Sequence, residues 1–202
     1  IRSFGRGIKR MDINNTVLKS RYWWFKDVYT PSQIKTINKK INNNFVEAID
    51  RPAPGIHKTA HVKIVNSSTI KELDKFFDYI RIANKLNFGF NLFDSLNERD
   101  FDFMNYNVYD SKSKGEYKYH IDTEFSHPIF DTKLTAVINL SLQHYEGGEF
   151  CINYDGNERI VPEITTPGNM IVFPSFFLHK VTPVTKGKRI TASFWVKGPK
   201  FI

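Results

Sequence analysis

The hexapeptide YKYHID at residues 117–122 places His120 and Asp122 two positions apart. In a β-strand, residues i and i+2 point to the same face, so this imidazole and this carboxylate would share one face, with Ile121 on the other. The two groups suit a divalent metal such as iron, manganese or zinc. Two ligands do not make a site, however, and an ordinary strand with polar residues on one face also explains the pair.

A third metal ligand is available in the segment FPSFFLHKVTPV (173–184), where His179 begins an expected strand after a Pro-Ser turn. A β-sandwich can bring strands that are distant in sequence side by side. Two histidines and one carboxylate form the facial triad of non-haem Fe(II) oxygenases, which leaves coordination positions open for a co-substrate and O₂. The alternative is that His179 is a structural histidine at a strand end.

Arg189 opens the alternating segment RITASFWVK, in which Arg189, Thr191, Ser193 and Trp195 share one strand face. If that face points inward, a guanidinium is buried and requires an anionic partner. The segment and the turn before it contain no Asp or Glu. A dicarboxylic keto acid could offer one carboxylate to this arginine and chelate a metal with its other end. Alternatively, Arg189 faces solvent beside the neighbouring lysines.

Helical signals dominate the first hundred residues. The spacing predicts a helix over residues 30–45, with Thr30 as N-cap and Pro31 at the first helical position. A second helix is predicted over residues 67–87, capped by Ser67 or Ser68, and the segment 57–66 between the two helices has β character. The apolar residues expected to face the core are Ile34, Ile37 and Ile41 in the first helix, and Ile70, Leu73, Phe76, Phe77, Ile80, Ile82 and Ala83 in the second.

From residue 101 onward, short apolar segments alternate with Gly, Pro, Asn and Asp. This pattern predicts strands separated by turns. The expected strands are 101–109, 116–122, 134–142, 149–154, 158–164, 169–174, 179–184 and 189–197. Eight short strands at this spacing favour a sandwich or jelly roll, and the preceding helices would cover one outer face in an α+β fold with one core.

The combination of YKYHID, LTAVINLS, YEGGEF, PGNMIVFPS, His179 and RITASFW resembles the 2-oxoglutarate/Fe(II)-dependent dioxygenases, and within them the prolyl-4-hydroxylase-like branch. The resemblance covers about residues 101–197. It implies a double-stranded β-helix, or jelly roll, with the N-terminal helices packed on one sheet. The whole chain, 1–202, would then be a single domain, with a basic arm and helices over about 1–100 and a catalytic core over about 101–197.

The resemblance also implies a role for each residue that matches a family motif. The Fe(II) ligands, and therefore the catalytic residues, would be His120, Asp122 and His179. The contacts to 2-oxoglutarate would be Arg189 for the far carboxylate, Thr191 as its hydroxyl neighbour, Tyr109 and Asn139.

Three positions depart from the family pattern or bear on the choice within it. The spacer between Tyr109 and Gly115 is longer than usual, and Asn139 stands where many relatives have a tyrosine. Members that demethylate nucleic acids usually carry a second arginine six residues after the first, where this chain has Trp195. The last departure argues against nucleic-acid demethylation, although a basic N-terminal arm would suit it.

The implied reaction uses Fe(II), 2-oxoglutarate as co-substrate and O₂, with ascorbate as a candidate reductant, and releases succinate and CO₂ as a C–H bond is hydroxylated. A peptidyl prolyl residue is the leading substrate. Hydroxylation of a free small molecule is the main alternative, followed by nucleic-acid demethylation. A jelly-roll binding module that has lost catalysis is an alternative from a different class, and the presence of all three metal ligands argues against it.

Composition sets further expectations. Net charge is +8, and residues 1–40 carry ten Lys/Arg against two acids, so the excess lies in the N-terminal part and could meet a polyanion or be a solvated arm. No recognised nucleic-acid motif accompanies it. The single cysteine, Cys151, excludes an internal disulfide. No apolar run is long enough for a membrane span and no signal peptide is visible, so a cytoplasmic, intracellular location with no membrane partner is expected.

Overall fold

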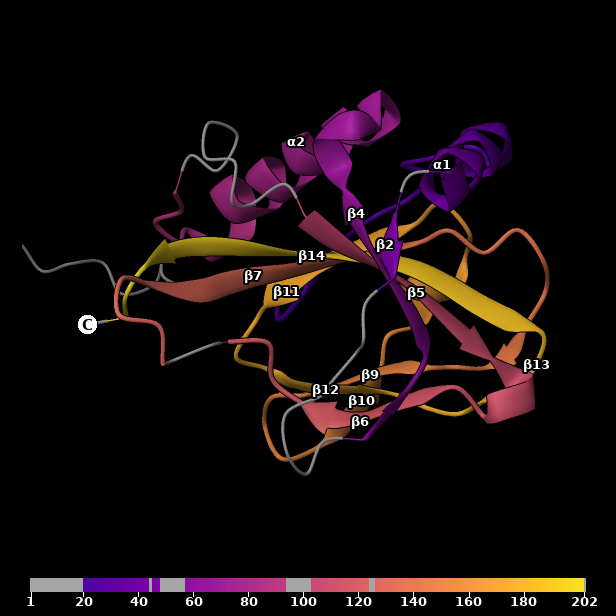
Figure 1. Cartoon of the computed structure of the whole chain (residues 1–202). Helices are drawn as coiled ribbons and strands as arrows, with labels where there is room; N and C mark the ends of the chain where they lie inside the picture. The colour runs from indigo at the N-terminus through magenta and orange to yellow at the C-terminus, as the bar shows by residue number, and fades with distance from the viewer. Residues whose placement is uncertain (1–19, 44, 48–56, 94–102, 124–125, 202) are drawn as a thin grey trace, which may run out of the picture.

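The computed structural model of the chain describes residues 20–43, 45–47, 57–93, 103–123 and 126–201. These residues form mostly antiparallel β-sheet with few helices (Figure 1). Residues 1–19, which carry five of the ten Lys/Arg of the basic N-terminal part, lie outside the described residues.

The larger sheet has seven strands, and all of its pairings are antiparallel. In spatial order they are β1 (Trp23–Phe25), β11 (Met170–Pro174), β7 (Phe130–Asn139), β14 (Lys188–Pro199), β5 (Phe103–Asp110), β4 (His61–Asn66) and β2 (Val46–Glu47). The long strand β14 therefore lies at the centre of the sheet, hydrogen-bonded to β7 on one side and β5 on the other.

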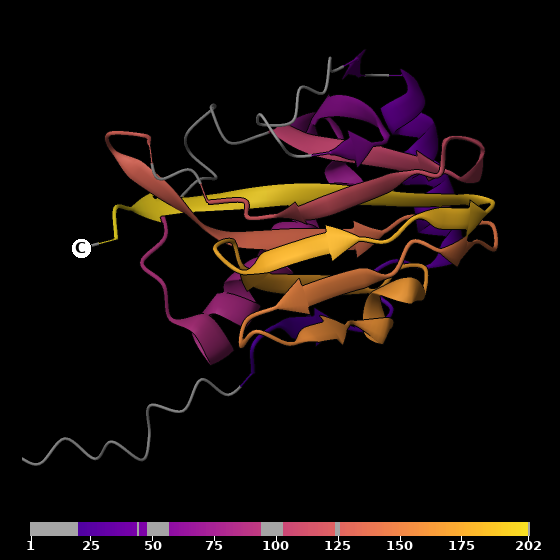
Figure 2. The same cartoon turned by 90° about the horizontal axis from the view of Figure 1, so that it is seen from below.

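A five-stranded antiparallel sheet lies below the larger one (Figures 1 and 2). Its spatial order is β10 (Glu158–Ile160), β9 (Phe150–Asn153), β12 (Leu178–Val181), β6 (Glu116–His120) and β3 (Lys58–Thr59). A two-stranded ribbon joins β8 (Glu146–Gly147) to β13 (Val184–Lys186). Because His120 ends β6 and Arg189 lies near the start of β14, the two sheets place the predicted site between them.

Successive side chains of β14 point to opposite faces of the larger sheet. Ala192, Phe194 and Val196 belong to a buried cluster that also holds side chains of the helices. Arg189, Thr191, Ser193 and Trp195 line a pocket on the opposite face, toward the five-stranded sheet. The prediction that these four residues share one strand face is confirmed, and the face points into the pocket rather than to solvent.

The predicted first helix is confirmed as α1 (Pro31–Asn43). Its N-terminus is closed reciprocally: the Thr30 backbone N–H donates to Oε1 of Gln33 at 3.0 Å, and the Gln33 N–H donates to Oγ1 of Thr30 at 3.4 Å. This capping box satisfies backbone donors that the first helical turn leaves unpaired. The three isoleucines predicted to face the core are buried, and their cluster contains residues of β7 and β14.

The prediction of one continuous helix over 67–87 is wrong. Two 3₁₀ turns, Ser67–Thr69 and Lys71–Leu73, come first, then α2 (Asp74–Ala83), then a π-helical turn over Asn84–Phe88. The cap is Asn66, whose Oδ1 accepts from the Ser68 N–H at 3.0 Å, rather than Ser67 or Ser68. Short polar side chains that bond to nearby backbone groups compete with α-helix formation, which delays the helix start.

Three strand predictions also need correction. The segment 158–164 is a strand only to Ile160, because Pro162 lacks an N–H and opens a 3₁₀ turn (Pro162–Thr165). The segment 179–184 divides into β12 and β13 around Thr182 and Pro183. The strand predicted over 134–142 runs from 130 to 139, because pairing with the far end of β14 extends it toward its N-terminus.

Aromatic rings link α2 to the larger sheet: the Phe194 ring lies 4.7 Å from Phe77 and 6.5 Å from Phe76, centroid to centroid, both edge-on.

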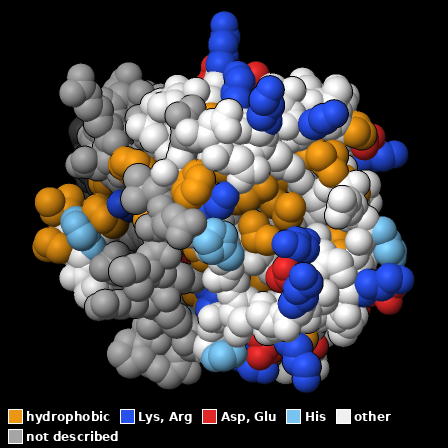
Figure 3. Space-filling model, turned by 45° about the vertical axis from the view of Figure 1, so that its right-hand side comes forward, with side chains coloured by type: hydrophobic (Ala, Val, Ile, Leu, Met, Phe, Trp, Pro, Cys, Tyr) orange, Lys and Arg blue, Asp and Glu red, His pale blue; other side chains and the backbone are white. Residues whose placement is uncertain are grey.

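None of the described helices has the length and apolar character needed to cross a membrane. On the face in Figure 3, lysine and arginine side chains stand beside acidic ones, with an apolar group near the centre.

Candidate metal centre

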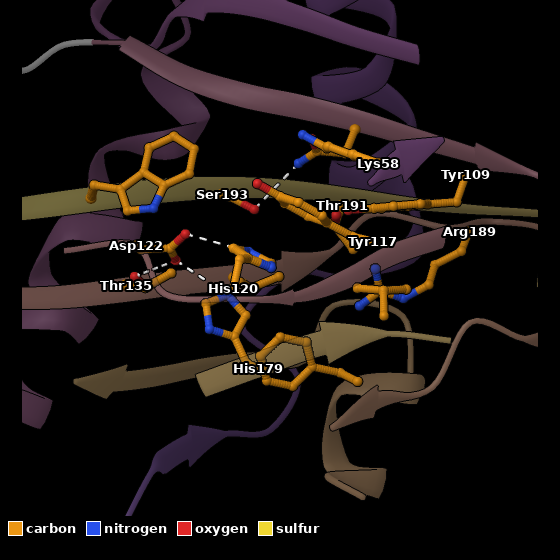
Figure 4. Close-up of a pocket in the computed structure, with 15 residues that line it drawn as sticks. Lys58, Tyr109, Tyr117, His120, Asp122, Thr135, His179, Arg189, Thr191 and Ser193 are labelled. Atoms are coloured by element: carbon orange, nitrogen blue, oxygen red, sulfur yellow. Dashed lines mark hydrogen bonds and ion pairs between the residues drawn. The ribbon is translucent and has the colours of Figure 1, made fainter. Parts of the chain in front are cut away.

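Strand pairing brings the three predicted metal ligands together. On β12, His179 lies directly opposite His120 on β6, and Asp122 follows two residues after the end of β6. Nε2 of His120 lies 3.5 Å from Oδ1 of Asp122, and Nε2 of His179 lies 3.3 Å from Oδ2 of the same carboxylate (Figure 4). The candidate ligand atoms all lie within 4.8 Å of one another. This is the spacing of groups that can converge on one ion.

Backbone carbonyls orient both imidazoles. Nδ1 of His120 lies 2.8 Å from the Lys118 carbonyl oxygen, and Nδ1 of His179 lies 2.9 Å from that of Phe177. When Nδ1–H donates to a carbonyl, Nε2 keeps its lone pair, which is the arrangement typical of metal-ligating histidines. Both Nε2 atoms therefore face Asp122 in the form that can bind a metal.

The electrostatics of the group favour an ionised Asp122 and a neutral His120. Burial alone raises the pKa of Asp122, but His179 and His120 outweigh it and hold that pKa well below its usual range. Burial lowers the pKa of His120, against the raising effect of Asp122. A carboxylate and neutral imidazoles are the protonation states that divalent metals require. The donor set of two nitrogens and one oxygen fits Fe(II).

Asp122 is held by two residues that the sequence did not single out. Oγ1 of Thr135 donates to Oδ2 of Asp122 at 2.8 Å, and this hydroxyl lies 3.0 Å from Oγ of Ser175. The Asp122 backbone N–H donates to the Ser175 carbonyl at 2.8 Å. The carboxylate is thus fixed from its backbone and from one oxygen. Neither contact could be found from spacing, because it depends on how β7 and the loop after β11 meet β6.

At the other end of the pocket, Arg189 lies opposite Tyr109 on β5. The arginine is 1% exposed, and its Nη2 has no hydrogen-bond partner among the described residues. Asp122 is the one carboxylate among the described residues that line the pocket. Burying a guanidinium with an unpaired nitrogen costs folding free energy unless an anion pairs with it. The arrangement can therefore receive a carboxylate at this end.

The backbone leaves room for the Arg189 side chain at Gly148. This glycine has φ +64°, and a Cβ added to it would lie 2.9 Å from both Cδ of Arg189 and Cγ2 of Val184. Both the left-handed conformation and the close approach disfavour a side chain at this position. The YEGGEF turn, predicted only as a strand connection, therefore also shapes the arginine end of the pocket.

The other three predicted contacts to 2-oxoglutarate do not all lie in the pocket. Tyr109 and Thr191 line the pocket, at 3% and 1% exposure. Asn139 does not line it: its Nδ2 donates to the Ile164 and Thr165 carbonyls, both at 2.9 Å, and its Oδ1 accepts from the Ser141 N–H. These bonds give Asn139 a structural part in joining β7 to the 3₁₀ turn.

Several further residues line the pocket without having been predicted as contacts. Tyr117 stacks on His120, with ring centroids 3.5 Å apart and planes at 17°. Lys58, Asn107, Val137, Phe150 and Val181 complete the walls. The cavity between the sheets has a volume of about 40 Å³.

Residues 104–197 match the family model of the 2OG-Fe(II) oxygenase superfamily. The match runs from β5 into β14 and includes the His-Asp-His group and Arg189. It coincides with the region over which the sequence motifs carry their resemblance.

Two similar curated proteins come from bacteria. A PKHD-type hydroxylase of Acidovorax ebreus is 34% identical over 89 residues, which are 41% of this chain and 38% of that protein. A PKHD-type hydroxylase of Shewanella oneidensis is 37% identical over 83 residues, 39% of this chain and 36% of that protein. The chain thus spans less than two-fifths of the length of these relatives.

Solved structures resemble the chain over most of its length. A Pseudomonas putida prolyl-4-hydroxylase superposes with a TM-score of 0.67 at 17% identity, covering 90% of this chain and 95% of that one. A Trichoplax adhaerens prolyl hydroxylase, in complex with a hypoxia inducible factor oxygen degradation domain peptide fragment, gives 0.64 at 15% identity, covering 91% and 88%. At these identities the likeness shows a shared fold.

Proposed function

Over residues 104–197 the chain belongs to the 2OG-Fe(II) oxygenase superfamily, and from this premise we propose that it is an iron- and 2-oxoglutarate-dependent hydroxylase. The observation that carries the proposal is the pairing of a His-Asp-His group with a buried, incompletely bonded Arg189 in one pocket. A metal ion and a dicarboxylic keto acid would satisfy both ends together.

In the proposed reaction, His120, Asp122 and His179 hold Fe(II). When bound, the iron and 2-oxoglutarate supply the O₂-dependent chemistry that hydroxylates a C–H bond, with succinate and CO₂ as co-products. The guanidinium of Arg189 binds the far carboxylate of the keto acid and fixes its direction, with Thr191 beside it. The hydrogen bond from Thr135 to Oδ2 of Asp122 fixes the orientation of the carboxylate toward the metal position.

Two features of the walls support a dry, oriented site. Val137, Phe150 and Val181 give an apolar lining between the metal end and the arginine end. Such a lining excludes water and strengthens the charge pairs inside it. Tyr109 lies beside Arg189 on the neighbouring strand β5. We also propose that Tyr109 contacts the keto acid.

As the finer fold, we propose a double-stranded β-helix in which the two sheets face each other and the N-terminal helices cover the outer face of the larger one. The shared cluster of α1, α2, β7 and β14 side chains supports this arrangement. We propose a single catalytic domain for the chain. Ascorbate is proposed as reductant on the family resemblance alone.

A peptidyl prolyl residue is the proposed substrate. The prolyl hydroxylases among the structural neighbours support this choice, and one of them was solved with a peptide. A small molecule is the second candidate, because the pocket mouth carries polar groups that would also bind one. Nucleic-acid demethylation is disfavoured because Trp195 stands where a second arginine is expected.

A succinate-release screen tests the function. The protein is reconstituted with Fe(II) and 2-oxoglutarate and offered prolyl peptides and free metabolites under air. We expect a prolyl peptide to raise succinate release above the substrate-free level and to gain the mass of one oxygen atom. Stimulation by small molecules alone would replace the peptide by the second candidate. Asp122→Ala, which lacks a metal ligand, is the negative control, and succinate release at the wild-type rate would count against the assigned ligand set.

A further inference from the structure

The pocket-facing residues of β14 form a row that runs from Arg189 to the metal centre. Arg189 is 1% exposed, whereas Ser193 and Trp195 are partly exposed, so the row leads outward toward solvent. At its outer end Trp195 pairs with Thr135, whose hydroxyl bonds to the metal-binding carboxylate. Figure 4 shows Ser193 between the arginine end and the metal end of the pocket. A substrate that approaches the metal from solvent therefore comes within reach of Ser193.

Asn107 lies beside Ser193 on the neighbouring strand β5, directly opposite Thr191. The residue lines the same pocket and is 3% exposed. Its Nδ2 donates to the Asn105 carbonyl oxygen and to Oγ of Ser193, both at 3.3 Å. A carbonyl can only accept, so this contact fixes which end of the side-chain amide carries the nitrogen. Oδ1 is the other end, and it has no hydrogen-bond partner among the described residues.

The hydroxyl of Ser193 is the complementary group. Its oxygen accepts from Asn107, so its hydrogen remains to be donated, and that hydrogen finds no acceptor among the described residues. The wall of the pocket therefore presents an acceptor, Oδ1 of Asn107, next to a donor, the O–H of Ser193. Neither group is charged, so the pair matches a neutral ligand group that carries a donor and an acceptor side by side.

The co-substrate does not match this pair. A dianionic keto acid carries only acceptor oxygens, so it can bond to Arg189 or to Ser193 but not to Oδ1 of Asn107. Leaving that buried acceptor without a donor costs free energy, and a ligand N–H would remove the cost. An amide supplies the N–H together with a carbonyl that can accept from Ser193. In an extended peptide, the N–H and C=O of one residue point to the same side.

We propose that Asn107 and Ser193 bind an amide of the hydroxylated substrate, with Oδ1 of Asn107 accepting from the amide N–H and the Ser193 hydroxyl donating to the carbonyl oxygen. The inference rests on the proposed function and narrows its substrate class to amide-bearing compounds. The amide belongs either to the main chain of a peptide or to a carboxamide of a small molecule. Because the nitrogen of a peptidyl proline carries no hydrogen, a prolyl substrate must donate from a residue beside the proline.

Two matched sets of probes test the amide site by succinate release. The first is the peptide acetyl-Gly-Ala-Pro-Ala-Gly-amide with two ester analogues, in which lactic acid replaces the alanine before or after the proline and so removes one N–H. The second is L-proline with L-prolinamide, which has a carboxamide in place of the carboxylate. We expect one ester analogue, or L-proline, to fall below its amide partner by about tenfold in kcat/KM, the size of one hydrogen bond.

Substitutions assign the preference to its residues. Asn107→Leu should abolish the difference between amide and ester, mainly through KM for the amide. Asn107→Asp keeps an acceptor oxygen and should retain the difference. Ser193→Ala should lower kcat/KM for every amide probe, and Ser193→Thr, which keeps the hydroxyl, should restore most of it. Asn157→Leu, at an exposed turn position, is the matched control and should behave as the wild type.

A preference confined to the peptides would assign the amide to a main chain, and one confined to L-prolinamide would assign it to a small molecule. Either result supports the inference. Three results would overturn it: no amide preference in either set, no turnover of any amide probe, or a preference that persists in Asn107→Leu.

The visible charge-transfer band of the Fe(II)–2-oxoglutarate complex separates this inference from the proposed function, and it also shows whether each variant keeps its co-substrate site. If the wild-type protein shows the band and the probes fail, the amide site is wrong and the proposed function stands. If the band is absent, the proposed function itself fails.

Discussion

Arg189 and Tyr109 lie directly opposite each other on β14 and β5, with the guanidinium carbon of Arg189 5.4 Å from the centre of the Tyr109 ring. The ring is near enough for a cation–π contact, but an aromatic face is a weaker partner for a buried charge than a carboxylate. Nη2 of Arg189 has no hydrogen-bond partner among the described residues. Among the described residues this buried charge therefore lacks a complete set of partners, and an anionic ligand would supply one.

Replacing this charge should separate ligand binding from stability. We expect Arg189→Met to weaken 2-oxoglutarate binding by about 10- to 100-fold, the size of a charged hydrogen-bonded contact. Without the keto acid, the free energy of unfolding should stay equal or rise, because an incompletely paired buried charge is removed. Calorimetric titration and denaturant melts measure the two quantities. An unchanged affinity would mean that another basic residue binds the co-substrate.

The hydroxyl of Thr135 should matter for the metal. We expect Thr135→Val, which keeps the shape but loses the bond to Oδ2 of Asp122, to lower Fe(II) affinity by about 10- to 100-fold. Thr135→Ser should restore most of it. Competition with a metallochromic chelator measures the affinity without turnover. Thr185→Val, at an exposed position on β13, is the matched control, and an equal loss there would indicate a general effect of the substitution type.

Gly148 and Gly156 offer a comparison of strain with steric clash. Both have positive φ, +64° and +85°, but a Cβ at Gly148 meets Arg189 and Val184, whereas a Cβ at Gly156 meets nothing within 4 Å. Gly156→Ala should cost about 1 kcal/mol of unfolding free energy from backbone strain alone. Gly148→Ala should cost more and should also weaken 2-oxoglutarate binding. Equal costs with intact binding would show that the arginine end tolerates a side chain at position 148.

Cys151 should be chemically inert in the folded protein. Burial raises the pKa of its thiol to about 11, and the residue is 0% exposed. Because this pKa is raised, the thiol stays protonated at pH 8 and the reactive thiolate grows only as the pH approaches 11. We expect negligible alkylation by iodoacetamide at pH 8 and rapid alkylation in denaturant, followed by mass spectrometry. Fast labelling of the folded protein at pH 8 would show that β9 opens.

The sequence alone could predict the residues of the metal group and the inward face of β14, because strand periodicity and motif resemblance operate within short segments. It could not predict the contact between Thr135 and Asp122, since that contact depends on the register of strands from two sheets. The unpaired Oδ1 of Asn107 is equally invisible, because an asparagine in a strand is compatible with either face and any partner.

In the helical region, apolar periodicity does not predict where the backbone departs from an α-helix. Apolar periodicity over residues 67–87 is compatible with one helix, and the buried residues Leu73, Phe76, Ile80 and Ala83 do lie on a common face. The break before Asp74 includes Ile70, whose backbone is not helical (φ −122°, ψ 87°) and lies between two 3₁₀ turns. Periodicity identifies most of the buried side chains here, but the prediction that Ile82 faces the core is wrong, since this residue is 43% exposed. Periodicity does not report such local backbone changes.

We propose that one pocket holds iron at His120, Asp122 and His179 and a keto acid at Arg189. Anaerobic titration of the Fe(II)-loaded protein with 2-oxoglutarate, followed by visible absorption, tests both parts together. We predict a weak charge-transfer band that saturates with 2-oxoglutarate, is absent in Asp122→Ala and needs far more keto acid in Arg189→Met. A folded, Fe(II)-loaded wild-type protein that shows no band would contradict the account.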